Sequence, residues 1–411
     1  MDRSEPASLP HNTQLSRRLM TALCLPASLA VLNALALSPF LSEIARDLNT
    51  SVAVLGQALT VTGLLGATFG LIIGPAAERI GYRRLMLCGL LALIVCDLGT
   101  AVAPSFPAIL LAQLVGGFSA ATITPMAYSI IGTRTEGEGR RRAIATIYAA
   151  SSAGNIIGFP VLSTIGDAYS WRWSFVAVAV AAAFGLVLAA FELPRDQPSE
   201  HSPLRYSTIL ATYRPLVRHE RMRLIYAAQF LRGVAWTGFL TYLGAFATDE
   251  LDASVQLAGF FWLMISPGFM VGSLLVGGRL RRVNPRGAFA LTTTTMGALI
   301  GLTLITQPPI PVTFLLLFAI ALFGGIAEVA AAGIVSSETP APQGATMSLH
   351  SSVLRFGTAT GALVGGGLLA LGGFSLLGVG LPIVAAIGGT IGWLSGRPST
   401  IPTPRPEPVR E

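Results

Sequence analysis

The segment GPAAERIGYRR, residues 74–84, separates two long apolar stretches of the chain. It holds one acid, Glu78, and three arginines, whereas the neighbouring stretches 52–76 and 85–104 hold a single charged residue, Asp97. Glycines at both ends of the polar run suit a tight turn, because glycine adopts positive φ values without a steric penalty. The segment therefore predicts a hairpin of two helices joined at a charged turn.

The same alternation of a long apolar stretch and a short polar connection continues along the chain. Of the 411 residues, 52% are hydrophobic and 11% are charged, with a mean hydropathy of +0.66, whereas soluble domains carry about 25% charged residues. Most of the apolar stretches are close to the ~20 residues that span a bilayer as a helix. They lie at residues 19–44, 52–76, 85–104, 107–132, 143–165, 174–192, 224–248, 256–278, 287–306, 311–337, 345–370 and 375–395. Composition and pattern together predict an all-α membrane protein with twelve transmembrane helices.

The basic residues indicate the orientation in the membrane. All 27 are arginines, and 23 of them fall in the tails and in alternate connections, on one side of the membrane. Only Arg46 and Arg172 fall on the other side, while Arg232 and Arg355 fall within spans. Because arginine-rich connections stay in the cytoplasm, we expect a multi-pass protein of the inner membrane with both termini cytoplasmic. The net charge of +7 follows from this bias, so a nucleic-acid partner is not expected.

The connection 193–223 is the one long polar gap between spans, and it divides the chain in two. We expect an N-terminal tail (1–18), a six-helix half (19–192), a cytoplasmic linker (193–223), a second six-helix half (224–395) and a C-terminal tail (396–411). A degenerate repeat supports this division, since residues 277–286 reproduce the glycine and arginine spacing of residues 74–83. Transporters built from two similar halves contain such repeats.

Three motifs make the chain resemble the major facilitator superfamily of membrane transporters. Segment 74–84 is similar to the loop signature between the second and third helices of that family. Gly158-Phe-Pro160 in the fifth span and the run from Trp171 to Phe175 before the sixth resemble its proton-coupled drug and sugar exporters. The resemblance covers about residues 20–395 and implies two six-helix halves around a central cavity, which alternating access opens to one side at a time. It also implies a transporter and not an enzyme.

In this family the loop after the second helix acts as a cytoplasmic latch. By resemblance, the gating residues are Gly74, Glu78, Arg79, Gly81 and Arg83, with Glu78 in place of the usual aspartate. The Glu78 carboxylate would face the positive N-terminus of the eleventh helix, an interaction of about 0.3–1 kcal/mol. The alternative is that these charges only anchor the turn at the cytoplasmic surface.

Small residues repeat every four positions in the second and fifth spans. Gly66, Gly70 and Gly74 form one stripe, and Gly154 and Gly158, followed by Pro160, form the other. Such stripes let helix backbones approach closely. In the family these two helices form the seam between the halves, so the stripes are expected to let the halves rock. Static packing is the alternative.

Three charged residues, Arg232, Glu328 and Arg355, lie well inside spans. A charge near the bilayer centre costs about 2.5–3.5 kcal/mol on the insertion scale, so it normally faces a cavity or a partner. At 1.5 Å per residue, all three lie ~12–15 Å from the cytoplasmic ends of their helices. We expect Arg232 and Glu328 to be partners, with Arg355 as a second cation nearby. Three roles stay open: Glu328 carries a proton, the arginines bind an anionic or polyhydroxylated substrate, or the pair only stabilises the C-terminal half.

Uncharged polar residues of the N-terminal half are weaker candidates. Asn33, Gln113 and Asn155 are expected at the substrate site, whereas a structural hydrogen bond explains Asp97 equally well. Gln113 stands where drug-exporting relatives carry an arginine, and the first span has no carboxylate at its middle. These departures argue against a polycationic drug and shift the charged machinery to the C-terminal half.

The sequence contains no motif for metal, cofactor or nucleotide chemistry. The four histidines have no partner at metal-ligand spacing, and the chain has no lysine for a phosphate-binding loop. No cofactor or metal is therefore expected, and ATP-driven transport by this chain is excluded. The predicted function is proton-coupled efflux of a small organic solute by a monomeric antiporter, with protons and membrane lipids as further partners. The alternatives are uptake or facilitated diffusion of a sugar- or nucleoside-like solute, and a transport-inactive receptor or scaffold on the same fold.

Overall fold

The computed structural model describes residues 15–135, 137–195, 213–277, 283–340 and 343–396. For some residues in these ranges, among them Gly74, Glu78 and Arg79, it describes the backbone alone. All regular elements in these ranges are helices, with no strand among them. The expected all-α membrane architecture is therefore confirmed.

The first bundle comprises the helices of residues 17–192. They are α1 (Arg17–Asn33), the 3₁₀ turn η1 (Ser38–Phe40), α2 (Leu41–Asp47), α3 (Val52–Leu55), α4 (Gln57–Ile80), α5 (Tyr82–Ala101), α6 (Phe106–Arg134), α7 (Gly137–Ala168) and α8 (Trp171–Glu192). The first span was expected to be continuous over 19–44, but it breaks after Asn33 and resumes as η1 and α2. Pro39 lies at the start of η1, where its missing N–H fits a helix start and not a helix interior.

The second bundle comprises the helices of residues 220–394. They are α10 (Glu220–Glu250), α11 (Val255–Phe260), α12 (Trp262–Gly277), α13 (Pro285–Thr306), α14 (Ile310–Ser337) and α15 (Gln343–Leu394). α15 is two spans in one, because its backbone leaves the helical region at Gly372 and Gly373, and Gly373 has a φ of 64°. The described residues contain ten segments that are long and apolar enough to cross a membrane. The last of them includes the break in α15, and α10 is a further 31-residue helix, which agrees with twelve spans.

The helical hairpin predicted around residues 74–84 is present. α4 ends at Ile80 and α5 begins at Tyr82, with Gly81 alone between them. Gly81 has φ 98° and ψ 138°, and its N–H donates to the Ala77 carbonyl at 2.9 Å. Residues with a Cβ atom rarely adopt this backbone conformation, so the turn requires glycine at this position.

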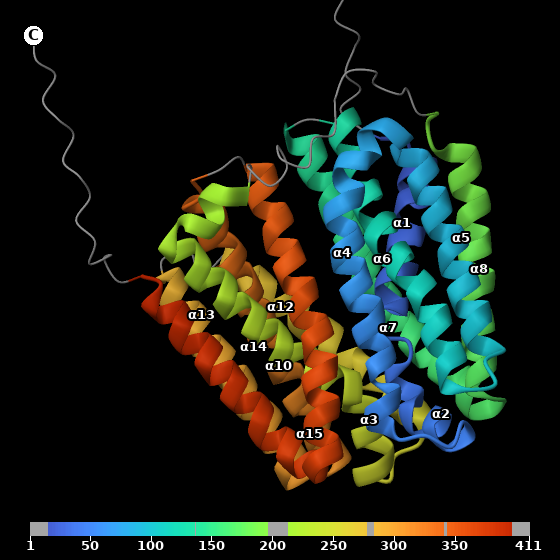
Figure 1. The fold of residues 1–411 in the computed structure, drawn as a ribbon, viewed down its shortest axis with the longest axis vertical. Coiled ribbons are helices and arrows are strands. Elements are labelled where there is room, and N and C mark those ends of the chain that lie inside the picture. Colours follow the sequence, from blue (N-terminus) through green and yellow to red (C-terminus); the bar gives the residue numbers. More distant parts are fainter. Residues whose placement is uncertain (1–14, 136, 196–212, 278–282, 341–342, 397–411) are drawn as a thin grey trace, which may run out of the picture.

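The two bundles lie side by side and approach each other where α2 and α3 lie, as Figure 1 shows. Ser38 Oγ donates to the Leu240 carbonyl at 2.6 Å, and Ser42 Oγ donates to Asp249 Oδ2 at 2.9 Å. Ser163 of α7 donates to the Gln256 carbonyl in the first turn of α11 at 3.2 Å. We call this end of the molecule the closed end, and the opposite end, where α8 stops and α10 begins, the linker end.

Close packing reinforces the closed end. The rings of Phe159 in α7 and Trp262 in α12 stack at 3.9 Å with an interplanar angle of 9°. A Cβ atom at Gly244 would lie 2.0 Å from the Ser38 carbonyl oxygen, so α10 can approach η1 only with glycine there. Four hydrogen bonds between the bundles belong to this end. Polar contacts and ring stacking thus hold the two bundles together at the closed end.

Candidate functional site

The centre of the second bundle contains a buried ion pair between Arg232 of α10 and Glu328 of α14. The Arg232 side chain is 2% exposed and the Glu328 side chain 21%. Gln229, one turn before Arg232, donates from Nε2 to Glu328 Oε2 at 2.7 Å and accepts from Arg232 Nε at 2.9 Å. The partnership expected between Arg232 and Glu328 is thus present, and Gln229 fixes both members.

His350 of α15 completes this cluster and was not a predicted member. Its Nε2 atom lies 3.3 Å from Glu328 Oε1, and its Nδ1 atom is buried without a hydrogen-bond partner among the described residues. Glu328 therefore contacts Arg232, Gln229 and His350, which come from two neighbouring helices. Glu328 is also the most exposed side chain of the cluster, since Arg232, Gln229 and His350 are almost fully buried.

Arg355 does not join this ion pair, although it shares α15 with His350. Its Nη1 atom is directed to the first bundle, where a Cβ atom at Gly66 of α4 would lie 3.9 Å from it. Tyr128 of α6 lies near the Arg355 cation. None of the residues in the described ranges pairs with Arg355 in a salt bridge or accepts a hydrogen bond from it. Arg355 is thus a cation of the second bundle that faces the first.

One face of α7 is turned to the second bundle. Tyr148, Asn155 and Phe159 lie within about 40° of one another around the helix, at 100° per residue. Phe159 of this face is buried against Trp262, whereas Tyr148, nearer the linker end, is 62% exposed and stacks on Tyr128 at 5.8 Å. The Oδ1 atom of Asn155, between them, is buried with no described partner. The space between the bundles is therefore accessible at Tyr148 and closed at Phe159.

The other polar candidates of the first bundle lie among its own helices. Gln113 is buried, accepts from Thr62 Oγ1 at 2.6 Å and donates to Thr100 Oγ1 at 3.4 Å. Asn33 contacts the Cys96 thiol of α5. Gln113 and Asn33 thus have partners within their own bundle, and contact of either with substrate stays a prediction. Asp97 is buried, and neither of its carboxylate oxygens has a described hydrogen-bond partner, so the expected structural hydrogen bond is not found.

The gating loop is described in part. Gly81 forms the turn, whereas the side chains of Gly74, Glu78 and Arg79 lie outside the described residues. Arg83 Nη2 donates to the Ala190 carbonyl at 2.7 Å, in the last turn of α8. Arg83 therefore ties the start of α5 to the end of α8 within the first bundle.

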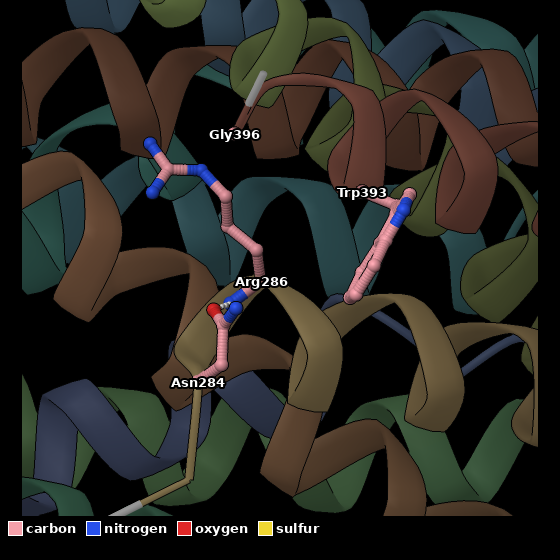
Figure 2. A pocket seen from close by; sticks show the side chains of 4 residues that line it. All are labelled: Asn284, Arg286, Trp393 and Gly396. Carbon is pink, nitrogen blue, oxygen red and sulfur yellow. Dashed lines mark hydrogen bonds between the residues drawn. The ribbon is translucent and has the colours of Figure 1, made fainter. Parts of the chain in front are cut away.

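The second copy of the repeat places Arg286 at the corresponding point of the second bundle. Figure 2 shows the small pocket of about 240 Å³ that Arg286 lines with Asn284, Trp393 and Gly396. Arg286 Nε donates to Ser395 Oγ at 3.2 Å, and its guanidinium forms an ion pair with Glu338 at the end of α14. The pocket lies at the linker end of α13 and α15, apart from the cluster around Glu328.

The seam glycines have different surroundings. A Cβ atom at Gly66 would lie 3.3 Å from Ala120 Cβ in α6, whereas one at Gly70 would have no neighbour within 4 Å. Cβ atoms at Gly154 and Gly158 would meet Ser28 and Leu32 of α1, in the same bundle. Pro160 lies inside α7, beside Phe159, which does contact the second bundle.

On α4 the glycine that contacts the second bundle is Gly63, where a Cβ atom would lie 3.1 Å from the Cβ atom of Ala359. α4 and α7 thus lie at the seam, but most of the predicted glycines face other neighbours.

The family model of the Major Facilitator Superfamily matches residues 23–306 of the chain. The chain is 27% identical over 333 residues to YceJ, an uncharacterised MFS-type transporter of Bacillus subtilis, covering 80% of this chain and 84% of YceJ. It is 29% identical over 211 residues to the multidrug resistance protein B homologue of Mycobacterium tuberculosis, covering 51% of this chain and 39% of the relative. The crystal structure of a peptide transporter, POT, superposes with a TM-score of 0.74 at 16% identity, covering 94% of this chain and 98% of that one.

The family model covers more than half of the chain, and the helical architecture agrees with it. The protein is therefore a multi-pass membrane transporter of small molecules and not an enzyme. Its two helical bundles, with a buried charge cluster in the second, belong to the major facilitator superfamily.

Proposed function

We propose that the protein exports a small organic solute in exchange for protons, with Glu328 as the proton-carrying group. The observation that carries this proposal is the position of Glu328. Its carboxylate is paired with Arg232, held by Gln229 and His350, and yet remains 21% exposed. Burial favours the neutral form of a carboxylate and a neighbouring cation favours the anion, so the protonation of Glu328 depends on how closely Arg232 stays paired with it.

Protonation of Glu328 would change the charge balance of the whole cluster. When Glu328 is an anion, its charge neutralises that of Arg232. When it is neutral, Arg232 is left buried without a counter-ion, which destabilises that arrangement by about 3–5 kcal/mol unless water or a solute anion compensates. Proton binding to Glu328 is thus coupled to a change in the solute or water contacts of Arg232. Exchange of a proton for a solute requires such coupling.

The proposed direction is export from the cytoplasm. The arginine bias predicts that the linker end is cytoplasmic, and the exposed Tyr148 lies toward that end. We infer that this conformation receives solute from the cytoplasm, and that opening of the closed end would release it outside. The partial similarity to a multidrug resistance protein homologue supports export. A latch at Glu78 would hold the linker end shut in the outward conformation.

The test is transport in proteoliposomes with a solute first identified by thermal-shift screening in detergent. Glu328→Gln should bind and exchange that solute down its gradient but lose uphill transport driven by a pH gradient. Glu338→Gln is the matched control, because Glu338 ends the same helix but pairs with Arg286 at the linker end. A Glu328→Gln protein that still concentrates solute with an unchanged pH profile would rule out Glu328 as the proton carrier, and Asp97 would be the next acid to examine.

A further inference from the structure

The space between the bundles contains a second group of polar and aromatic side chains, separate from the Glu328 cluster. It consists of Arg355 from α15, Tyr128 from α6, and Tyr148 and Asn155 from α7. Two of its members lack described partners: the partly buried Arg355 has no counter-ion or hydrogen-bond acceptor, and the buried Asn155 carbonyl oxygen has no donor, among the described residues. Because buried polar groups are normally satisfied, the Asn155 oxygen in particular suits a partner such as a bound solute.

The chemistry of that partner follows from the groups around it. An arginine without a counter-ion binds a carboxylate through two parallel hydrogen bonds. The stacked rings of Tyr128 and Tyr148 offer flat faces that pack on another aromatic ring in an offset or edge-on manner. The Asn155 carbonyl oxygen accepts one hydrogen bond from a hydroxyl or amino group. No described acid lies in this group to attract a cationic solute.

We propose that Arg355, Tyr148, Tyr128 and Asn155 form the binding site for a small aromatic carboxylate that carries a hydroxyl or amino substituent. Arg355 binds the carboxylate, the tyrosines pack against the ring, and Asn155 binds the substituent. Tyr148 and Asn155 are seven residues apart on one face of α7, or about 10 Å along its axis. A single substituted ring is of the size to fit between them. The site rests on the proposed transport of a small organic solute but is independent of proton coupling.

The two bundles contribute different parts of this site, which gives the solute a role in the conformational change. Arg355 belongs to the second bundle, whereas both tyrosines and Asn155 belong to the first. A solute that contacts all four bridges the bundles on the linker side of the closed end. Binding would therefore draw the linker end together, and a solute that binds only one conformation more tightly shifts the equilibrium by that difference in affinity.

The experiment measures equilibrium binding by calorimetry to the purified full chain in lipid nanodiscs. The probe is 4-hydroxybenzoate, with two controls: the neutral 4-hydroxybenzyl alcohol, which lacks the carboxylate, and cyclohexanecarboxylate, which keeps the carboxylate but lacks the aromatic ring and the hydroxyl group. Wild-type protein should bind 4-hydroxybenzoate about tenfold or more tightly than either control, because each control leaves at least one part of the site unpaired. Equal affinity for the acid and the alcohol would overturn the proposal without any variant.

Variants assign the roles. Arg355→Gln should weaken 4-hydroxybenzoate binding about tenfold or more and leave the alcohol unaffected, while Arg355→Lys should keep part of the affinity. Tyr148→Leu should weaken binding of both aromatic probes but not of cyclohexanecarboxylate, and Tyr148→Phe should restore it. Arg223→Gln removes an exposed arginine of α10 and serves as the matched control. Unchanged affinity for 4-hydroxybenzoate in a folded Arg355→Gln protein would exclude Arg355 from the site.

Failure of this inference and failure of the proposed function have different signatures. Glu328→Gln should leave 4-hydroxybenzoate affinity within about threefold of wild type, because Arg355 and Glu328 form no ion pair. A protein that binds the acid but transports it without protons keeps the site and refutes the coupling. A protein that couples protons to another solute and does not bind 4-hydroxybenzoate refutes the site and keeps the coupling.

Discussion

Arg83 and Arg286 occupy equivalent places in the two bundles. Each lies at the start of the third span of its half, and each hydrogen-bonds to the end of the last span: Arg83 to the Ala190 carbonyl in α8 and Arg286 to Ser395 just after α15. A cation at a helix C-terminus is favourable because the last carbonyl groups carry partial negative charge. The weak repeat in the sequence thus corresponds to a shared structural device that joins the third and sixth helices of each half.

The first prediction concerns this device. Arg286→Gln should lower the free energy of unfolding by about 1 kcal/mol, because its partner Glu338 is 30% exposed and such pairs are individually weak. Arg223→Gln, which removes an exposed arginine, should change it by less than about 0.5 kcal/mol. Thermal unfolding in detergent measures both. Equal melting temperatures for the two variants would contradict a stabilising role for Arg286.

The second prediction concerns the pair between Arg232 and Glu328. Glu328→Leu leaves a buried guanidinium without its counter-ion and should destabilise the protein by about 3–5 kcal/mol. The double variant Arg232→Leu with Glu328→Leu should recover most of this loss, because both charges are then absent from the apolar interior. A double-mutant cycle of unfolding free energies gives the coupling energy. A value near zero would mean that the two side chains do not stabilise each other in solution.

The third prediction compares two glycines of α4 and its turn. Gly81→Ala should destabilise the protein by about 1–2 kcal/mol, because alanine is strained at positive φ. Gly70→Ala should leave stability equal or higher, since a Cβ atom there meets nothing within 4 Å. If the linker end closes over Gly70 during transport, Gly70→Ala should nevertheless slow transport. Normal transport by Gly70→Ala would remove Gly70 from the moving seam.

The fourth prediction tests whether the closed end must open. Ser42 and Asp249 are hydrogen-bonded across the two bundles. In a background without Cys24, Cys88 and Cys96, a Ser42→Cys and Asp249→Cys protein joined by oxidation or by a short bifunctional thiol reagent should lose transport. Reductant should restore it when the join is a disulfide. The single variant Ser42→Cys, treated in the same way, is the control, and undiminished transport by the cross-linked protein would show that this contact never separates.

The fifth prediction is topological. Epitope tags at residue 1, within residues 193–223 and at residue 411 should all be accessible from the cytoplasmic side alone, as the arginine bias indicates. Protease protection in spheroplasts and in inverted vesicles gives the two complementary readouts. Protection of any one tag in inverted vesicles contradicts the expected orientation.

The sequence predicted the fold well because lipid imposes a simple requirement on each span. A run of about 20 apolar residues predicts a transmembrane helix regardless of which other helices pack against it. The break between Asn33 and Ser38 was missed for the same reason, because hydropathy measures only apolar character and stays high where the helix is interrupted. At Gly81 the prediction held, since a positive φ needs a particular residue type.

The candidate site was predictable only where charge signalled it. Arg232 and Glu328 stood out because ionised groups are rare within spans. Gln229 and His350 carry no such signal, and their contact with Glu328 depends on how α10 and α15 rotate about their axes. Spacing likewise showed that Gly154 and Gly158 share a face of α7, but it could not show that the face is covered by α1.

The stacking of Phe159 on Trp262 makes the intrinsic fluorescence of Trp262 sensitive to opening of the closed end. The indole is buried against a ring of the other bundle, so water is kept from it as long as the closed end stays shut. Separation of the two rings would move tryptophan emission to longer wavelengths. With the other four tryptophans replaced, Trp262 fluorescence would follow the opening of the transporter in real time, without any attached label.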